Sequence, residues 1–191
     1  MSKPLYLLVG RSASGKTTIA NLLESEYGLC QLQSYTTRPK RSEDEVGHTF
    51  ISNDEFDELA NIVGYTEYHG HRYCSTKEQI DAVDTYVIDV HGVETLLKSY
   101  KSDRPIIVIY FDATIRTRID RMIDRGESDA FIVSRLYNDD EFDWKQELNK
   151  LVWHYKNNER KSVEMYIVDA NQDIETVVGQ IVSYMNHKEE E

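Results

Sequence analysis

The residues best suited to chemistry form one short segment near the start of the chain, Gly10-Arg11-Ser12-Ala13-Ser14-Gly15-Lys16-Thr17. The segment fits the phosphate-loop pattern, in which two glycines flank four residues and are followed by a lysine and a hydroxyl residue. The glycines let backbone N–H groups turn toward a polyphosphate. Lys16 would neutralise the β- and γ-phosphates, and the Thr17 hydroxyl would join the coordination shell of Mg²⁺.

The segments on either side supply the context that this pattern requires. Leu5 to Val9 is a short apolar run that predicts a buried strand, and Lys16 to Tyr27 carries apolar residues at helical spacing. A strand, a glycine loop and a helix in this order favour a nucleoside triphosphate site, which we expect to be an ATP site that also includes Thr18. The alternative is an accidental glycine-rich turn.

Two groups of arginines follow, and each has a possible role in binding phosphate. Arg38 and Arg41 precede and follow Pro39, which disfavours helix at Arg38, and paired guanidinium groups suit bidentate capture of a phosphate. Arg121 and Arg125 are spaced four residues apart on a predicted helix and so share a face. The alternative in both places is a solvated basic surface.

Composition limits the classes of partner. The net charge of −12 and the pI of about 4.9 argue against nucleic-acid binding, so an anionic substrate needs a local basic pocket. Cys30 and Cys74 are isolated and favour a reducing compartment. No apolar run reaches spanning length, which predicts a cytoplasmic protein with no membrane partner. We expect a monomer or a homodimer.

The order of motifs along the chain resembles that of guanylate kinases. After the phosphate loop come a Ser-x-Thr-Thr-Arg-x-x-Arg segment (34–41), a Gly and an aromatic before a Phe (47–50), and a Glu before Gly-x-x-Tyr-x-Ser (67–75). The match continues with an apolar strand ending in Asp-x-x-Gly (87–92). It ends with a lid pattern of Arg-x-x-x-Arg-Gly and a later Arg-Leu (121–136), and it fades beyond Leu136.

The resemblance implies roles for individual residues in ATP-dependent phosphorylation of GMP or dGMP. Glu67 would accept from guanine N1–H and N2–H, whereas adenine offers an acceptor at N1 and would leave the carboxylate unpaired. Asp89 would either organise Mg²⁺ through water or face the monophosphate, and its structural alternative is a helix cap. The implied guanine-edge residues are Ser34, Glu67 and Ser75, the implied monophosphate-binding residues are Arg38, Arg41, His48 and Tyr73, and the implied catalytic residues are Lys16, Arg38, Arg121, Arg125 and Arg135.

The chain also departs from the family pattern. His48 stands where the family usually has Tyr, and Cys74 stands where it usually has Gly. The loop between Arg41 and Phe50 is shorter than usual. These differences bear on phosphate affinity more than on the choice of base.

The predicted fold is one α/β domain with a mainly parallel sheet flanked by helices, of the P-loop NTPase type, with an inserted monophosphate-binding subdomain and a helical lid. We place the core at 1–33, 85–112 and 138–191, the insert at 34–84 and the lid at 113–137. Predicted strands outside the phosphate-loop unit are 30–34, 85–89, the central 106–111 and 165–169, and helices are expected to start near Thr114, at 138–141 and at Ile174.

Two other functions remain open at this stage. A related kinase would keep the phosphate loop and lid and act on another nucleotide or on a phosphorylated sugar. A non-catalytic guanylate-kinase-like domain would bind protein partners, although such domains typically lack phosphate-loop or lid residues that are present here.

Overall fold

Two four-stranded sheets organise the described part of the chain, which comprises residues 3–40, 43–68, 70–139, 143–159 and 161–190 of a computed structural model. Sheet A is parallel throughout, with the strand order β6-β1-β7-β8. Its two central strands are almost wholly buried, as expected where helices cover both faces of a parallel sheet. The predicted parallel sheet is confirmed, and its strands are β1 (Leu5–Val9), β6 (Thr85–Val87), β7 (Ile106–Asp112) and β8 (Val163–Asp169).

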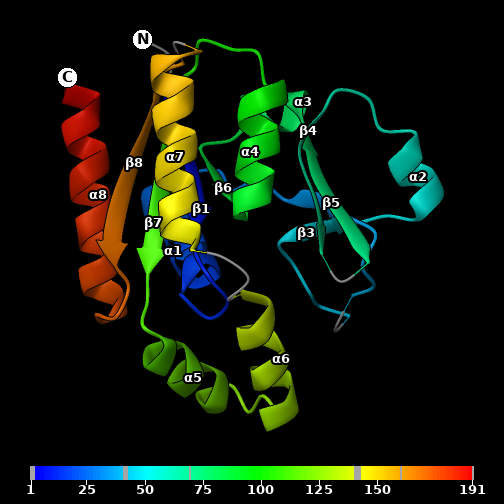
Figure 1. Ribbon diagram of the computed structural model, residues 1–191, viewed down its shortest axis with the longest axis vertical. Helices are drawn as coiled ribbons and strands as arrows, with labels where there is room; N and C mark the ends of the chain where they lie inside the picture. The colour runs from blue at the N-terminus through cyan, green and yellow to red at the C-terminus, as the bar shows by residue number, and fades with distance from the viewer. Residues whose placement is uncertain (1–2, 41–42, 69, 140–142, 160, 191) are drawn as a thin grey trace.

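Successive side chains of β1 point to opposite faces of sheet A and join different cores. Leu5 and Leu7 pack with residues of α4 and α7, whereas Tyr6 and Leu8 pack with residues of α1 and α8. In Figure 1, α7 and α4 lie on the viewer's side of the sheet, and α1 lies behind it. The covering helices are α1 (Lys16–Tyr27), α4 (Val90–Ser99), α7 (Trp144–Asn157) and α8 (Ile174–Glu190).

Sheet B stands beside sheet A, on the right of Figure 1, and has the strand order β3-β2-β5-β4. The β2–β3 pair is parallel, and the β2–β5 and β4–β5 pairs are antiparallel. Helix α4 packs against β4 and so joins the two sheets. The elements of this region are β2 (Ser34–Thr36), β3 (His48–Phe50), α2 (Asn53–Asp57), β4 (Ile62–Tyr68), β5 (His71–Thr76) and α3 (Lys77–Ala82).

Two helices, α5 (Ile115–Asp124) and α6 (Asp129–Asp139), project beyond the carboxyl end of β7 at the bottom of Figure 1. Thr114 caps α5, as predicted, because its hydroxyl accepts from the Thr117 N–H at 3.2 Å. Helix α5 ends at Asp124, and Gly126 takes the left-handed conformation (φ +72°) that turns the chain into α6.

Arg104 ties the end of the sheet B region to sheet A. Its guanidinium donates to the Ile80 carbonyl at 2.6 Å and the Val83 carbonyl at 2.7 Å. The same group donates to the carbonyls of Lys3 (2.8 Å) and Pro4 (3.0 Å), which directly precede β1. One side chain thus holds two chain segments that lie about eighty residues apart.

Three predicted element boundaries are wrong. The predicted helix start at 138–141 is not observed at its described residues, because Asp139 ends α6 and Asp143 caps α7 by accepting from the Gln146 N–H at 3.1 Å. Between residues 30 and 33 only Gln31 forms an isolated bridge, and the strand begins at Ser34. Strand β6 ends at Val87 because Asp89 caps α4.

None of the described helices combines the length and the apolar character needed to cross a membrane.

Candidate active site

The glycine loop (residues 10–17) leaves the carboxyl end of β1 and enters α1. A Cβ on Gly10 would lie 2.7 Å from Ser14 Oγ and 2.9 Å from the Cβ of Phe111, so only glycine fits there. Gly15 has φ +99° and stands at the N-cap of α1 without a side-chain cap, which leaves the first N–H groups of the helix available to an anion.

The Lys16 side chain folds back over the loop. Its ammonium donates to the carbonyls of Gly10 at 2.6 Å and Arg11 at 2.9 Å, and to Ser14 Oγ at 3.4 Å. Removal from water lowers the pKa of Lys16 to about 8, and the nearby Asp139 carboxylate opposes that shift. The lysine is therefore held by oxygen atoms of the glycine loop at the N-terminus of α1.

Lys16 lines a cavity of about 390 Å³ together with residues that the sequence predicted to bind the acceptor nucleotide. Glu67 from β4 and Asp89 from the start of α4 line this cavity, so the structure brings them to the same space as the glycine loop. Within the described residues, Ser34, Arg38, His48, Tyr73 and Ser75 do not contribute to its lining. The full lining is Gly10, Ser12, Lys16, Thr66, Glu67, Tyr68, Val87, Ile88, Asp89, Val90, His91, Arg135, Asp139 and Trp144.

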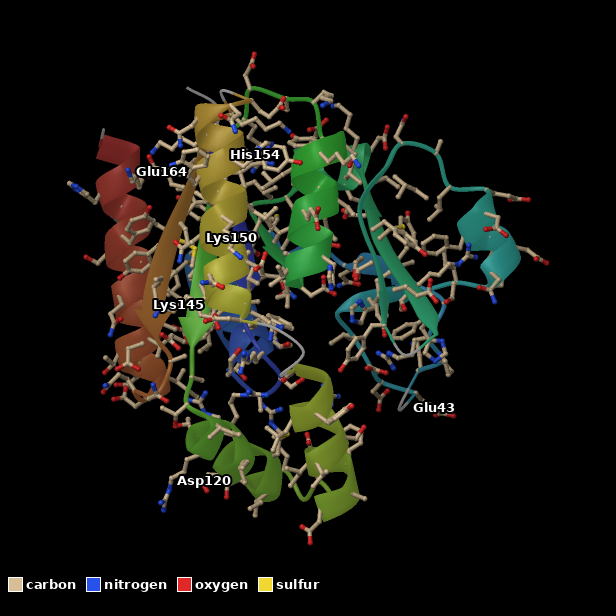
Figure 2. The ribbon with its side chains drawn as sticks, viewed as in Figure 1. Glu43, Asp120, Lys145, Lys150, His154 and Glu164 are labelled. Carbon is tan, nitrogen blue, oxygen red and sulfur yellow. The ribbon has the colours of Figure 1, made fainter. Side chains whose placement is uncertain are left out.

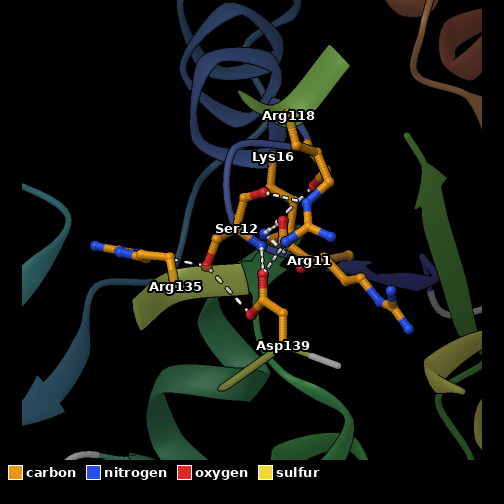
Figure 3. A network of polar contacts seen from close by, with 8 residues as sticks. Arg11, Ser12, Lys16, Arg118, Arg135 and Asp139 are labelled. Atoms are coloured by element: carbon orange, nitrogen blue, oxygen red, sulfur yellow. Dashed lines mark hydrogen bonds and ion pairs between the residues drawn. The ribbon is translucent and has the colours of Figure 1, made fainter. Parts of the chain in front are cut away.

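Ser12 is held by three groups from α5 and α6 (Figure 3). Its N–H donates to Asp139 Oδ2 at 2.7 Å, and its hydroxyl donates to Asp139 Oδ1 at 3.2 Å. Arg118 Nε donates to the Ser12 carbonyl at 2.8 Å, and Arg118 also forms an ion pair with Asp139. The predicted lid residue Arg135 reaches Ser12 Oγ at 3.4 Å.

Sequence reasoning missed Arg118 and Asp139. A signal existed for Arg118, because it lies three residues before Arg121 and seven before Arg125 and so shares their helical face. No local signal existed for Asp139, because its partner Ser12 is 127 residues away.

Arg121 and Arg125 lie differently from one another. Arg121 donates to the carbonyls of Ser14 at 3.1 Å and Ala170 at 2.8 Å, and burial, followed by the neighbouring charge of Arg125, lowers its pKa. Arg125 forms the C-cap of α5 and lines a second cavity, of about 340 Å³, together with residues of the glycine loop and the first turn of α1. The remaining lining residues of that cavity are Ala13, Gly15, Lys16, Thr17 and Thr18.

In sheet B, the predicted guanine and phosphate residues contact one another. Ser34 Oγ lies 2.9 Å from Nδ1 of His48, and the His48 ring meets the Tyr73 ring edge-on with centroids 5.7 Å apart. Ser75 is fully buried and donates to the Val63 carbonyl at 3.0 Å. These polar atoms are thus engaged within the sheet.

Arg38 forms a two-pronged ion pair with Glu45. The two guanidinium–carboxylate distances are 2.7 Å and 3.2 Å, and both side chains are largely buried. The Arg38 guanidinium also lies over the Phe50 ring, 5.3 Å from its centroid. Arg41 lies outside the described residues.

Glu67 and Asp89 differ in how firmly they are held. Glu67 is exposed, and its Oε2 accepts from the Tyr65 hydroxyl at 3.5 Å. Asp89 Oδ1 accepts from the Gly92 N–H at 2.7 Å, the capping arrangement that the sequence left as an alternative. The same residue also lines the main cavity.

Comparisons with known proteins give a consistent result. No protein-family model matches the chain. Guanylate kinases of Agrobacterium fabrum and Bartonella henselae are 28% and 29% identical to it, over 70% of the chain. The matched region spans just under two thirds of those relatives, 66% and 65% of their length.

The fold is also found in a solved structure. The guanylate kinase of Anaplasma phagocytophilum superposes with a TM-score of 0.54 at 16% identity, covering 98% of this chain and 86% of the other. The predicted resemblance is therefore confirmed: the chain is similar in sequence to guanylate kinases and shares their fold.

Proposed function

We propose that this protein transfers the γ-phosphoryl group of ATP to GMP or dGMP. The observation that carries the proposal is the single cavity in which Lys16 of the glycine loop and Glu67 of sheet B both take part. Such a cavity lets two nucleotides meet end to end between the two regions. Relatives that are named guanylate kinases support the same reaction.

Catalysis requires no covalent intermediate. The acceptor phosphate attacks the γ-phosphorus of ATP in line, and the protein contributes alignment and neutralisation of charge. Lys16 and Arg135 line the cavity where the two phosphates would meet, so they neutralise charge on the transferring group. Arg121, which contacts the Ser14 carbonyl, and Arg125, which lines the second cavity, hold the donor polyphosphate. Arg38 holds the acceptor phosphate.

The residues at the loop fit a Mg²⁺ ion that arrives with ATP. Thr17 is exposed in the first turn of α1, and Asp89 lines the main cavity, so both offer the oxygen ligands that Mg²⁺ prefers. Among the described residues no three His, Cys, Asp or Glu side chains gather as a metal site. Thr17 would bind the ion directly and Asp89 through water, and the ion would neutralise phosphate charge.

Helices α5 and α6 act as the lid in this proposal. Their arginines already touch the glycine loop, through Arg121 on Ser14 and Arg135 on Ser12. Closure over both nucleotides would exclude water, because an open site would hydrolyse ATP.

One observation favours a second candidate, a kinase of this kind that acts on a different nucleoside monophosphate. Ser34 and Ser75 direct their hydroxyls to His48 and to the Val63 carbonyl, while Glu67 lines the main cavity without them. A pocket in which Glu67 acts alone would select less strictly for guanine.

The test is release of ADP from ATP and Mg²⁺ against a panel of GMP, dGMP, AMP, CMP, UMP, dTMP and ribose bisphosphate. Turnover with GMP or dGMP alone supports the proposal. Preference for another monophosphate favours the second candidate. If no substrate of the panel leads to ADP release, both kinase candidates are contradicted, and a non-catalytic binding domain remains.

A further inference from the structure

The buried ion pair between Arg118 and Asp139 has a place in the molecule that phosphoryl transfer does not by itself explain. Arg118 is 1% exposed and Asp139 is 3% exposed, which is rare for charged side chains. Neither residue belongs to the predicted phosphate-binding set. Both nevertheless contact the glycine loop at the same residue, Ser12.

The pair satisfies every polar group of Ser12. Asp139 accepts from the Ser12 N–H at 2.7 Å and from its hydroxyl at 3.2 Å, while Arg118 donates to its carbonyl at 2.8 Å. Figure 3 shows Arg118 and Asp139 on opposite sides of Ser12. Since Arg118 comes from α5 and Asp139 is the last residue of α6, two consecutive helices more than a hundred residues after the loop fix one of its residues.

The next residue shows why Ser12 needs to be held. Ala13 has φ +59°, a left-handed conformation that is unfavourable for alanine because its Cβ comes too close to the following carbonyl oxygen. Such a conformation persists where the surroundings over-determine it. The Ser12 contacts fix the chain before Ala13, and Arg121 fixes the chain after it through the Ser14 carbonyl at 3.1 Å.

We propose that Arg118 and Asp139 are positioning residues for the glycine loop. The two residues, here called the clamp, hold Ser12 and so maintain the left-handed turn at Ala13. The backbone N–H groups that follow this turn then face the donor polyphosphate. The clamp also makes the shape of the loop depend on the docking of α5 and α6. The inference rests on the proposed function only for its kinetic readout, because ATP binding tests it independently.

The central experiment measures ATP binding by titration calorimetry in the double variant Arg118→Met/Asp139→Ala. Removing both charges avoids leaving one of them buried and unpaired. We expect the Kd for ATP to rise by at least about 10-fold, with kcat/KM for ATP falling by about 10- to 100-fold. KM for GMP should change less than the Kd for ATP, because the contacts that hold Ser12 are made to the glycine loop.

A matched control exists on the same helix. Arg116 and Asp120 of α5 form an exposed i,i+4 ion pair, with side chains 90% and 62% exposed, and Asp120 lies on the outer side of the helix (Figure 2). The variant Arg116→Met/Asp120→Ala makes the same chemical changes away from the loop. It should leave the Kd for ATP within about twofold of the wild-type value, as expected of an exposed pair.

A second variant keeps the test decisive if the double variant does not fold. Arg118→Lys preserves the charge beside Asp139 but cannot contact Asp139 and the Ser12 carbonyl with one rigid fork. We expect a rise of about 3- to 10-fold in the Kd for ATP.

A folded variant of this pair that melts earlier but binds ATP within about twofold of the wild type would overturn the proposal, because a merely structural role predicts that result. Failure of the wild type to phosphorylate GMP would count against the proposed function alone, since the ATP titration still decides the role of the clamp.

Discussion

The donor side of the cavity (the glycine loop with α5 and α6) and the acceptor side (sheet B) place their charged groups in different ways. On the donor side, Lys16 and Arg121 hydrogen-bond to backbone carbonyls of one continuous loop, those of Gly10 and Ser14. On the acceptor side the polar side chains pair with one another, as Arg38 does with Glu45.

This difference has a functional consequence. Carbonyl groups keep their place when a lysine turns toward a phosphate, so the donor side is formed before its ligand arrives. Arg38 is held in a two-pronged ion pair, so a monophosphate must displace the Glu45 carboxylate to reach the guanidinium. We therefore expect donor-side changes to affect catalysis and ATP binding, and acceptor-side changes to affect the affinity and selectivity for the monophosphate.

The largest effect is expected from Lys16→Ala. Loss of the cation at the meeting point of the phosphates should lower kcat by about 100- to 1,000-fold in the ADP-release assay. Lys145→Ala is the control, because that lysine pairs with Asp112 at 2.7 Å and does not line the main cavity. Activity above a tenth of the wild-type value in Lys16→Ala would show that the donor side does not act through this residue.

Glu67→Gln tests whether the acceptor side binds guanine through this carboxylate. The amide would face a guanine N–H with one of its own donors, so kcat/KM for GMP should fall by roughly 10- to 100-fold while KM for ATP is unchanged. Steady-state kinetics with each substrate varied in turn give both values. Glu58→Gln, at the exposed C-cap of α2, serves as the control. Equal turnover of GMP by the Glu67 variant and the wild type would remove the guanine assignment.

The pH profile should distinguish the two sides further. Since burial lowers the pKa of Lys16 to about 8, its ammonium is protonated below that pH and loses its proton as the pH rises through it. The value of kcat/KM for ATP should therefore fall by about fivefold between pH 8 and pH 9, as the protonated fraction of a group with that pKa does. Arginine stays charged over this pH range, so an active Lys16→Arg variant should not show the fall in kcat/KM above pH 8. A wild-type profile flat to about pH 10 would contradict the assignment.

The smallest effect is expected from Glu45→Gln. Removing the carboxylate frees Arg38 for the monophosphate, so KM for GMP should fall by about 3- to 10-fold with kcat little changed. A higher KM would show instead that Glu45 holds Arg38 in its productive position. Glu43→Gln in the same loop, an exposed residue labelled in Figure 2, provides the comparison.

The donor side could be predicted from sequence because its geometry is local. The glycine loop is a continuous segment between a buried strand and a helix, and Gly10 and Gly15 have the conformational roles that the pattern requires. The central position of β7 also followed from its apolar run, since only a strand covered on both faces is apolar throughout.

What could not be predicted depends on contacts distant in sequence. Asp139 was predicted to lie in the acidic first turn of a helix. It is instead the last residue of α6, and its carboxylate pairs with Arg118 and Ser12. The partners of Ser34 and Arg38 depend on strand register and on the course of the loop before β3, which periodicity does not determine. The roles assigned to all the site residues, Ser34, Ser75 and Asp89 among them, stay predictions.

Arg104 has a mechanical consequence. Its guanidinium joins the carbonyls of Ile80 and Val83, at the end of the sheet B region, to those of Lys3 and Pro4, just before β1. That end of the region is pinned to sheet A by four hydrogen bonds from one planar group. Any swing of sheet B toward the glycine loop must then pivot about this anchor, so that displacement grows with distance from Arg104 and is smallest beside it.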